Sequence, residues 1–137
     1  IMDFHLGMAE QVNIDMPSKE EVYECKWLTD IELQYYVDVF NNTQFQGGLN
    51  WYRCMIDESV QSKLRVFSNL KIDIPSMFIA GRQDWGIYQK PDALENMQLK
   101  ICTNMQSCEL IDGAGHWVQQ EKPEEVAKLL LSFLSKL

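Results

Sequence analysis

Positive charge, histidine and long apolar runs are all scarce in this sequence of 137 residues. The 12 Lys and Arg are outnumbered by 20 Asp and Glu, for a formal net charge of −8. This balance argues against the basic surface that nucleic-acid phosphates require. No apolar run approaches the roughly 20 residues that span a bilayer, and the N-terminus lacks the basic start and apolar stretch of a signal peptide. These absences predict a soluble, cytoplasmic protein with neither a nucleic-acid nor a membrane partner.

Metal-ligating residues are few and scattered. Cysteine occurs four times, at Cys25, Cys54, Cys102 and Cys108. No pair has CxxC spacing, and the chain has only two histidines, His5 and His116. We therefore expect no metal site and no other cofactor. Because nothing else in the sequence indicates secretion, we expect all four thiols to be reduced.

The first 26 residues are polar, with weak periodicity, and are expected to form an N-terminal arm. The chain begins with Ile1 followed by Met2, and this start has two interpretations. Either Met2 is the natural first residue and the chain is a complete gene product, or Ile1 follows a cut inside a longer protein.

The next segment, residues 27–70, is predicted to be helical. Thr29 and Glu32 have the spacing of a capping box, which predicts the start of a first helix. A second helix is expected over residues 50–67, after a loop that contains Gly47-Gly48. Apolar residues recur at helical spacing in both helices, so we expect each helix to bury one face.

The last segment, residues 71–137, has the pattern of a parallel α/β unit. Apolar runs at 74–81 and 107–112 each end at a glycine or just before one, which predicts two buried strands. A helix is expected between them from Pro91 to about residue 97, and another is expected from Pro123 onward. Strands that are apolar along their whole length and are separated by helices are typical of a parallel sheet.

One acidic residue and one histidine follow the two predicted strands. Asp84 lies three residues past the first strand, and His116 follows the second strand after Gly113-Ala114-Gly115. Because open α/β sheets build their sites at the carboxyl ends of parallel strands, we expect the two side chains at one edge. An Asp followed by a His is the order of the two helper residues in a hydrolase triad. Taken singly, Asp84 could instead cap a turn, and His116 could be a structural residue.

Several longer motifs support a hydrolase. They are Trp-Leu-Thr-Asp at 27–30, Phe-Gln-Gly-Gly-Leu-Asn-Trp-Tyr-Arg at 45–53 and Gly-His-Trp-Val-Gln-Gln-Glu-Lys-Pro-Glu at 115–124. Together they resemble the cap and the C-terminal core of epoxide hydrolases with the α/β-hydrolase fold, whose cap carries a similar Gly-Phe-Arg-Gly-Pro-Leu-Asn-Trp-Tyr-Arg segment. The resemblance covers about residues 27–137. It departs from the family at Gln44, Gln46 and Gly48, where the family has Gly, Arg and Pro.

The resemblance implies a role for three side chains. Tyr52 would hydrogen-bond the epoxide oxygen, because a phenol stabilises developing negative charge. His116 would be the base that activates water, and Asp84 would orient it. Nearby aromatic residues are expected to bind substrate: Phe45, Trp51, Trp85 and Trp117. The other interpretation of Trp51 and Tyr52 is an ordinary aromatic pair in the core.

The nucleophile of this family is missing from the sequence. In the family it is an Asp on a strand–elbow–helix turn upstream of the cap. Residues 1–26 contain no Gly-x-Asp-x-Gly elbow and no oxyanion-hole loop, and Asp3 and Asp15 have the wrong surroundings. We therefore predict a truncated α/β-hydrolase-like fold, with a cap-like segment (residues 27–70) followed by the C-terminal half of the core (residues 71–137). Such a chain cannot form the covalent ester intermediate by itself.

Three functions follow from this prediction. The chain could be a complete protein whose apolar pocket catalyses a non-hydrolytic cyclisation or Diels–Alder-type reaction on a terpenoid or polyketide in secondary metabolism. It could be the C-terminal fragment of an epoxide hydrolase, or a non-catalytic binding protein for an apolar ligand. The Ile1-Met2 start favours the first. A free sheet edge and apolar helix faces predict either a homodimer or an N-terminal hydrolase segment as partner.

Overall fold

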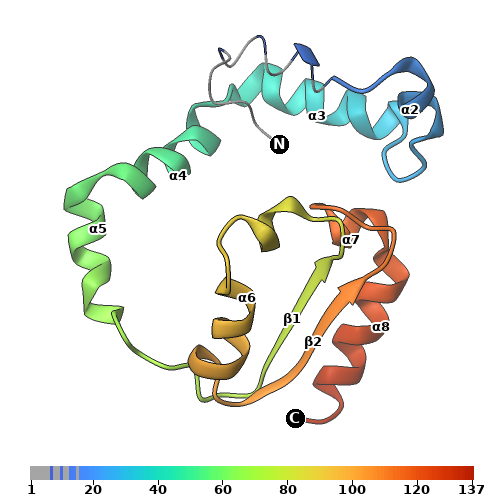
Figure 1. Ribbon diagram of the computed structural model, residues 1–137. Helices are drawn as coiled ribbons and strands as arrows, with labels where there is room; N and C mark the ends of the chain where they lie inside the picture. Colours follow the sequence, from blue (N-terminus) through green and yellow to red (C-terminus); the bar gives the residue numbers. More distant parts are fainter. Residues whose placement is uncertain (1–6, 8–9, 11–12, 15) are drawn as a thin grey trace.

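The helices of the first half form an open arc, and the second half forms a two-stranded parallel sheet flanked by helices (Figure 1). The computed structural model describes residues 7, 10, 13–14 and 16–137. The arc consists of α2 (Lys19–Glu24), α3 (Asp30–Thr43), α4 (Gln46–Ile56), α5 (Glu58–Leu64) and the 3-10 turn η1 (Arg65–Phe67). Part of the predicted N-terminal arm (residues 1–6, 8–9, 11–12 and 15) lies outside the described residues, and α2 falls within its last part.

Helix α3 begins where the capping box predicts. The Thr29 hydroxyl accepts from the backbone N–H of Glu32 at 3.3 Å, and the Glu32 carboxylate accepts from the backbone N–H of Thr29 at 2.8 Å. These hydrogen bonds from Thr29 lower the pKa of Glu32. The prediction for this helix start is confirmed, because the signal is local and two backbone donors are satisfied by neighbouring side chains.

The single helix predicted over residues 50–67 is wrong. The chain forms two helices there, because Asp57 ends α4 and caps α5 by accepting from the N–H groups of Ser59 and Val60. The predicted loop at Gly47-Gly48 is also wrong, since both glycines lie within α4. A helical glycine costs only about 1 kcal/mol relative to alanine, and the residues that follow continue the helix.

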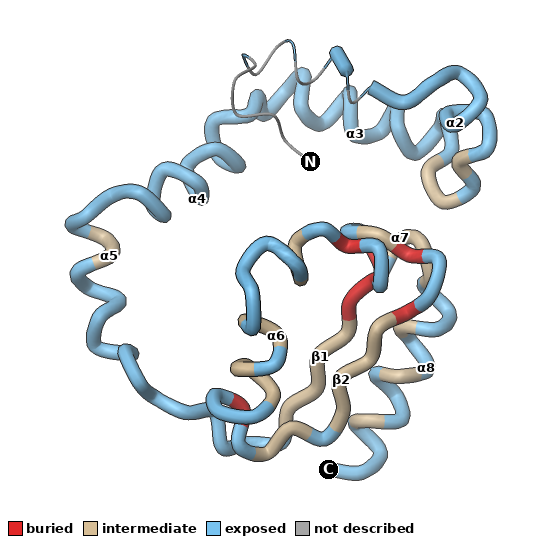
Figure 2. The backbone as a smooth tube through the Cα atoms, in the orientation of Figure 1, coloured by how far each residue is buried: buried red, intermediate tan, exposed pale blue. Residues whose placement is uncertain are grey.

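The apolar stripes of the arc are not buried, contrary to prediction (Figure 2). Tyr36 and Phe40 of α3 are exposed, and Trp51 of α4 is 73% exposed. The stripes are those of amphipathic helices, but within the described residues they find little to pack against. The spacing therefore predicts the helices correctly and their burial incorrectly.

The second half begins with the predicted strand–helix–strand order. It consists of β1 (Ser76–Gly81), η2 (Trp85–Tyr88), α6 (Ala93–Asn96), the π-helical turn η3 (Met97–Ile101), β2 (Met105–Ile111), α7 (Val118–Glu121) and α8 (Pro123–Leu134). The strands are parallel, with Ala80 opposite Leu110, so both predicted strands and their direction are confirmed. The middle helix begins at Ala93 rather than Pro91 and continues as the π-helical turn.

The buried core is small and lies where the strands end. Ile111, Ala114 and Val118 are buried together, and Val126 and Leu129 of α8 pack against them. Figure 2 shows most of the buried residues at the carboxyl ends of the strands, next to α7. Pro123 starts α8 as predicted. Its apolar side chains are buried only in part, because Leu130 and Leu134 are exposed.

The four cysteines are free thiols in the structure. Cys102 is buried, and burial, with the neighbouring Glu109 carboxylate, raises the pKa of Cys108. Among the described residues, no helix has the length and apolar character needed to cross a bilayer.

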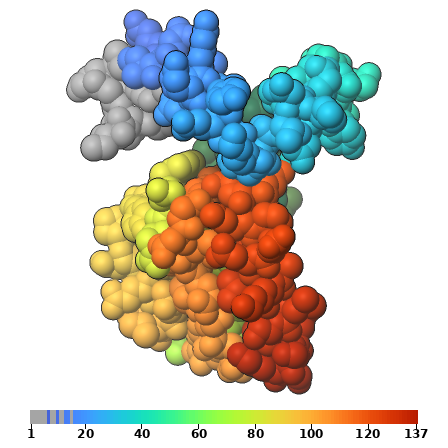
Figure 3. Space-filling view, turned by 90° about the vertical axis from the view of Figure 1, so that its right-hand side faces the viewer, coloured from blue at the N-terminus to red at the C-terminus, as the bar shows by residue number. Residues whose placement is uncertain are grey.

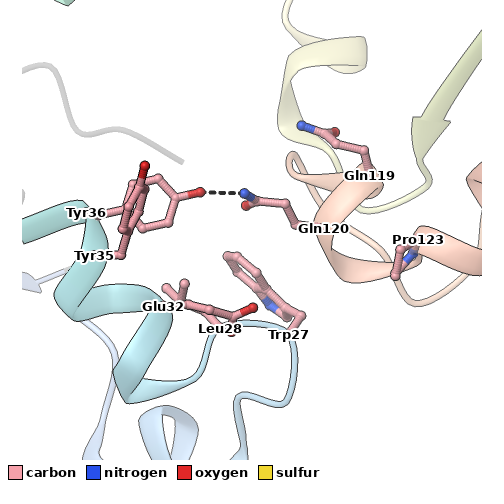
Figure 4. Close-up of a pocket in the computed structure, with 8 residues that line it drawn as sticks. All are labelled: Trp27, Leu28, Glu32, Tyr35, Tyr36, Gln119, Gln120 and Pro123. Atoms are coloured by element: carbon pink, nitrogen blue, oxygen red, sulfur yellow. Dashed lines mark hydrogen bonds between the residues drawn. The ribbon is translucent and has the colours of Figure 1, made fainter. Parts of the chain in front are cut away.

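The arc and the sheet unit meet between α3 and α7. In the space-filling view the N-terminal helices rest on one end of the sheet unit (Figure 3). The Gln120 side-chain amide donates to the Tyr36 hydroxyl at 2.6 Å across this contact (Figure 4). Beside it lies a cavity of about 410 Å³, lined largely by Trp27, Leu28, Tyr35, Tyr36, Gln120 and Pro123.

Candidate active site

The loops that follow β1 and β2 touch, and this contact builds the site. The backbone N–H of Arg82 donates to the carbonyl of Ile111 at 2.9 Å, and that of Gln83 donates to the carbonyl of Ala114 at 3.0 Å. Gly81 permits the approach, because a Cβ there would lie 2.2 Å from the carbonyl oxygens of Ala114 and Gly115. The two strand ends are therefore locked together next to Asp84.

Asp84 and His116 form a hydrogen-bonded pair at this edge. The Asp84 Oδ1 atom lies 3.0 Å from His116 Nδ1 and also accepts from the backbone N–H of Gly86 at 2.8 Å. The Asp84 side chain is only 12% exposed, whereas that of His116 is 49% exposed. Asp84 also caps the η2 turn. It therefore has both of the roles that the sequence allows, as the partner of His116 and as a turn cap.

The contact fixes which imidazole nitrogen carries a proton. An ionised carboxylate only accepts hydrogen bonds, so Nδ1 of His116 must be the donor. In the neutral ring Nε2 is then unprotonated and acts as an acceptor. The pair therefore presents one basic nitrogen on a half-exposed ring, which is the arrangement of a general base oriented by an acid.

The protonation of Asp84 is shifted by its surroundings. Burial alone would raise the pKa of Asp84, but hydrogen bonds from His116 and Gly86 and the nearby imidazolium charge together lower it below its usual value. A lowered pKa in the folded state means that the carboxylate stabilises the fold fully above the unfolded pKa of about 3.9, and that this contribution is lost as the pH falls through the folded pKa.

We therefore expect Asp84→Asn to change the acid sensitivity of the chain. The difference in urea midpoint between the unsubstituted chain and Asp84→Asn should be largest at neutral pH and should shrink below about pH 4. The comparison isolates Asp84 because the capping carboxylates, whose pKa values are also lowered, are present in both proteins. An equal difference at pH 7 and pH 3 would contradict the assignment.

Two of the predicted aromatic residues flank the imidazole. The Trp85 ring stacks near His116, with centroids 5.6 Å apart and planes at 21°, and the Trp117 ring meets it edge-on at 5.2 Å. Both indoles are more than half exposed. They form an aromatic rim around the ring and limit how the imidazole turns.

The other predicted site residues are not brought to this pair. Tyr52 is 66% exposed and lines a shallow hollow made of α4 residues alone. Figure 1 shows α4 in the middle of the arc, between α3 and α5 and away from the strand ends. Trp51 is also exposed, and Phe45 stacks on Phe40 with ring centroids 4.6 Å apart. The predicted pocket that joins Tyr52 to His116 and Asp84 is therefore not assembled in this structure.

Polar contacts that the sequence does not predict also hold the two loops together. Arg82 pairs with Asp112 across the strand ends, and the Tyr88 hydroxyl donates to the Arg82 carbonyl at 2.9 Å. The Glu121 carboxylate accepts from two backbone N–H groups beside His116. Glu121 lies in the motif at 115–124, but the motif by itself says nothing of what its side chain contacts. Within the described ranges, no group of three or more His, Cys, Asp or Glu could hold a metal ion.

Known proteins were compared with the chain by sequence. No protein-family model matches it. Epoxide hydrolase A of Mycobacterium tuberculosis is 38% identical over 112 residues, which is 81% of this chain and 33% of that protein. The bifunctional epoxide hydrolase 2 of rat is 30% identical over 126 residues, covering 92% of this chain and 22% of that enzyme. The chain thus spans about a third or less of the length of these curated relatives.

Solved structures give the same relationship. Epoxide hydrolase A of Mycobacterium thermoresistibile superposes with a TM-score of 0.66 at 37% identity, over 81% of this chain and 33% of that one. Epoxide hydrolase I of potato superposes with a TM-score of 0.80 at 25% identity, over 96% of this chain and 41% of that one. The predicted resemblance and the predicted fold class are both confirmed.

Proposed function

Since the chain is related to part of the epoxide hydrolases with the α/β-hydrolase fold, we propose that it supplies the water-activating half of an epoxide hydrolase site. The observation that carries this proposal is the contact between Asp84 and His116, which leaves Nε2 of the imidazole as the free base. In this role the chain works with a nucleophile carried by another polypeptide segment. The substrate class is a small apolar epoxide.

The pair would act in the second step of the reaction. The nucleophilic carboxylate first attacks an epoxide carbon; the ring C–O bond breaks and the ring oxygen takes a proton from the Tyr52 hydroxyl, which gives a hydroxy ester. His116 Nε2 then takes a proton from water while the water oxygen attacks the ester carbonyl. The acyl C–O bond breaks, the alcohol oxygen receives the proton from Nε2, and the resulting carboxylic acid returns its proton to the Tyr52 phenolate, so that the diol leaves and the carboxylate is restored. Asp84 keeps the imidazole in the required tautomer and stabilises the imidazolium. Tyr52 remains the predicted hydrogen-bond donor to the epoxide oxygen.

The exposed surface supports the need for a second segment. Within the described residues β1 pairs with β2 alone, so its outer edge carries unpaired backbone groups that another strand could satisfy. Large apolar side chains along the arc are also exposed, and large exposed apolar surface is typical of interaction sites. A second copy of the chain is the other partner that the sequence predicts, and the homodimer stays a prediction.

The non-hydrolytic alternative has less support. A cyclisation or Diels–Alder-type reaction by this chain alone needs an apolar pocket that encloses the substrate next to polar anchors. The 410 Å³ cavity lies between α3 and α7, and neither Tyr52 nor His116 lines it. Conversion of a polyene by the purified chain would favour this alternative, and binding without conversion would favour the non-catalytic one.

A chimera tests the proposal. Residues 27–137 would replace the matching segment of the Mycobacterium tuberculosis epoxide hydrolase A, which supplies the remaining two thirds of the enzyme. We expect the chimera to hydrolyse styrene oxide to the diol, and we expect the 137-residue chain to show no turnover above background. Hydrolysis by the chain alone, or a folded chimera that is inactive, would contradict the proposal.

A further inference from the structure

The Glu121 carboxylate accepts hydrogen bonds from the backbone on both sides of His116. Its Oε2 atom accepts from the N–H of Gly115 at 2.7 Å, and its Oε1 atom accepts from the N–H of Trp117 at 3.0 Å. The two donors are the residues immediately before and after the histidine. A single side chain therefore fixes the position of the backbone that carries the imidazole.

The backbone of Glu121 is fixed by its place at the end of α7. Glu121 ends α7, whose first residue, Val118, is buried in the core cluster. The N–H of Glu121 donates to the carbonyl of Trp117 at 2.9 Å and closes the turn. The fit at the other end is equally close, because a Cβ on Gly115 would lie 3.3 Å from Glu121 Oε1. The carboxylate thus links α7, which Val118 anchors in the core, to a loop that is largely exposed.

The imidazole is held less closely than the backbone that carries it. The His116 side chain is half-exposed, contacts Asp84 through one nitrogen and lies between the exposed rings of Trp85 and Trp117. If the backbone at Gly115 and Trp117 moved, the ring could turn away from Asp84 or take the other tautomer. Hydrogen bonds to a charged acceptor are the stronger kind, and two of them in parallel fix an orientation as well as a position.

We propose that Glu121 is a positioning residue that holds His116 against Asp84. Its role in catalysis rests on the proposed function, but the placement of the ring does not. Loss of these two hydrogen bonds should leave the fold intact and let the imidazole sample both tautomers. In the chimera, a misplaced base should lower kcat by about 10- to 100-fold, and KM should fall with it because the ester accumulates before the slowed second step.

The informative substitution is Glu121→Gln. It keeps the length of the side chain, but its amide nitrogen is a donor and faces a backbone donor, so one of the two hydrogen bonds is lost. Glu121→Asp keeps the charge and shortens the reach, so it cannot bridge both N–H groups. Glu125→Gln is the matched control, because Glu125 is an exposed residue in the first turn of α8 and loses the same charge.

The experiment is nuclear magnetic resonance of the 137-residue chain. The imidazole ¹⁵N shifts at about pH 9, where histidine is ordinarily neutral, report the tautomer. We expect a single Nδ1–H form in the unsubstituted chain and in Glu125→Gln, and averaged shifts in Glu121→Gln. We also expect the amides of Gly115 and Trp117 to exchange at least about tenfold more slowly than unstructured amides in the unsubstituted chain, because both are hydrogen-bonded.

Two results would overturn the inference. One is unprotected Gly115 and Trp117 amides in the unsubstituted chain, and the other is a single unchanged tautomer in Glu121→Gln. If Glu121→Gln does not fold, Glu121→Asp gives the same tautomer readout. None of these readouts needs turnover. An inactive chimera in which His116 shows the single Nδ1–H tautomer would therefore count against the proposed function alone.

Discussion

Gly81→Ala is expected to destabilise the sheet unit by about 3 kcal/mol or more. The new Cβ would lie 2.2 Å from two backbone carbonyl oxygens, and backbone atoms on a packed loop cannot move aside as the end of a flexible side chain can. Overpacking usually costs about 1–3 kcal/mol, and this site is at the upper end because the clash is with main chain. The measurement is urea unfolding followed by tryptophan fluorescence.

A second glycine provides the control for Gly81→Ala. A Cβ at Gly47 in α4 would have no heavy atom within 4 Å outside its own helix. Gly47→Ala should leave the chain equally stable or stabilise it by up to about 1 kcal/mol. Equal midpoints for Gly81→Ala and the unsubstituted chain would show that the loops after β1 and β2 do not meet as described. Loss of the tautomer signal of His116 in Gly81→Ala would support the contact.

His116→Asn is expected to lower the steady-state rate of the chimera by about 10²- to 10⁴-fold, the usual contribution of a general base. Asparagine keeps a polar side chain of similar size but has no basic nitrogen at the position of Nε2. Asp84→Asn should also lower the rate, because the charge that stabilises the imidazolium is lost and the amide no longer fixes the Nδ1–H tautomer. Initial rates of diol formation from styrene oxide measure both effects.

The control for these rates is again Glu125→Gln, which removes a charge from an exposed position outside the site. Its rate should match that of the unsubstituted chimera. Circular dichroism spectra that superpose would show that the slower variants are folded. A His116→Asn chimera as fast as the parent would remove His116 from the mechanism.

The sequence predicts those features whose causes are local. The Thr29 capping box joins residues three apart, and the strand at 76–81 is marked by an uninterrupted apolar run. The parallel direction follows from the helix between the strands. Once that direction is known, Asp84 and His116 are both placed at the carboxyl edge. The contact between their side chains, however, depends on the close approach at Gly81.

The features that the sequence does not predict depend on more distant parts of the molecule. The stripe that contains Tyr36 and Phe40 has the spacing of a buried face, but spacing does not say what covers that face. Asp57 could be an ordinary helix residue until its side chain is seen to cap α5. Tyr52 belongs to a matching motif, yet its distance from His116 depends on where α4 lies (Figure 1). Glu121 is one of several acidic residues near α8, and only the fold shows which of them contacts the histidine loop.

The role of His116 as the water-activating base is tested by the intact mass of the His116→Asn chimera after mixing with styrene oxide. If His116 activates water for the second step, the first step still runs and the ester accumulates. We then expect the protein mass to rise by that of one styrene oxide molecule, while the unsubstituted chimera turns over without an adduct. Rapid diol formation by His116→Asn with no adduct would contradict the assignment of His116 as the water-activating base.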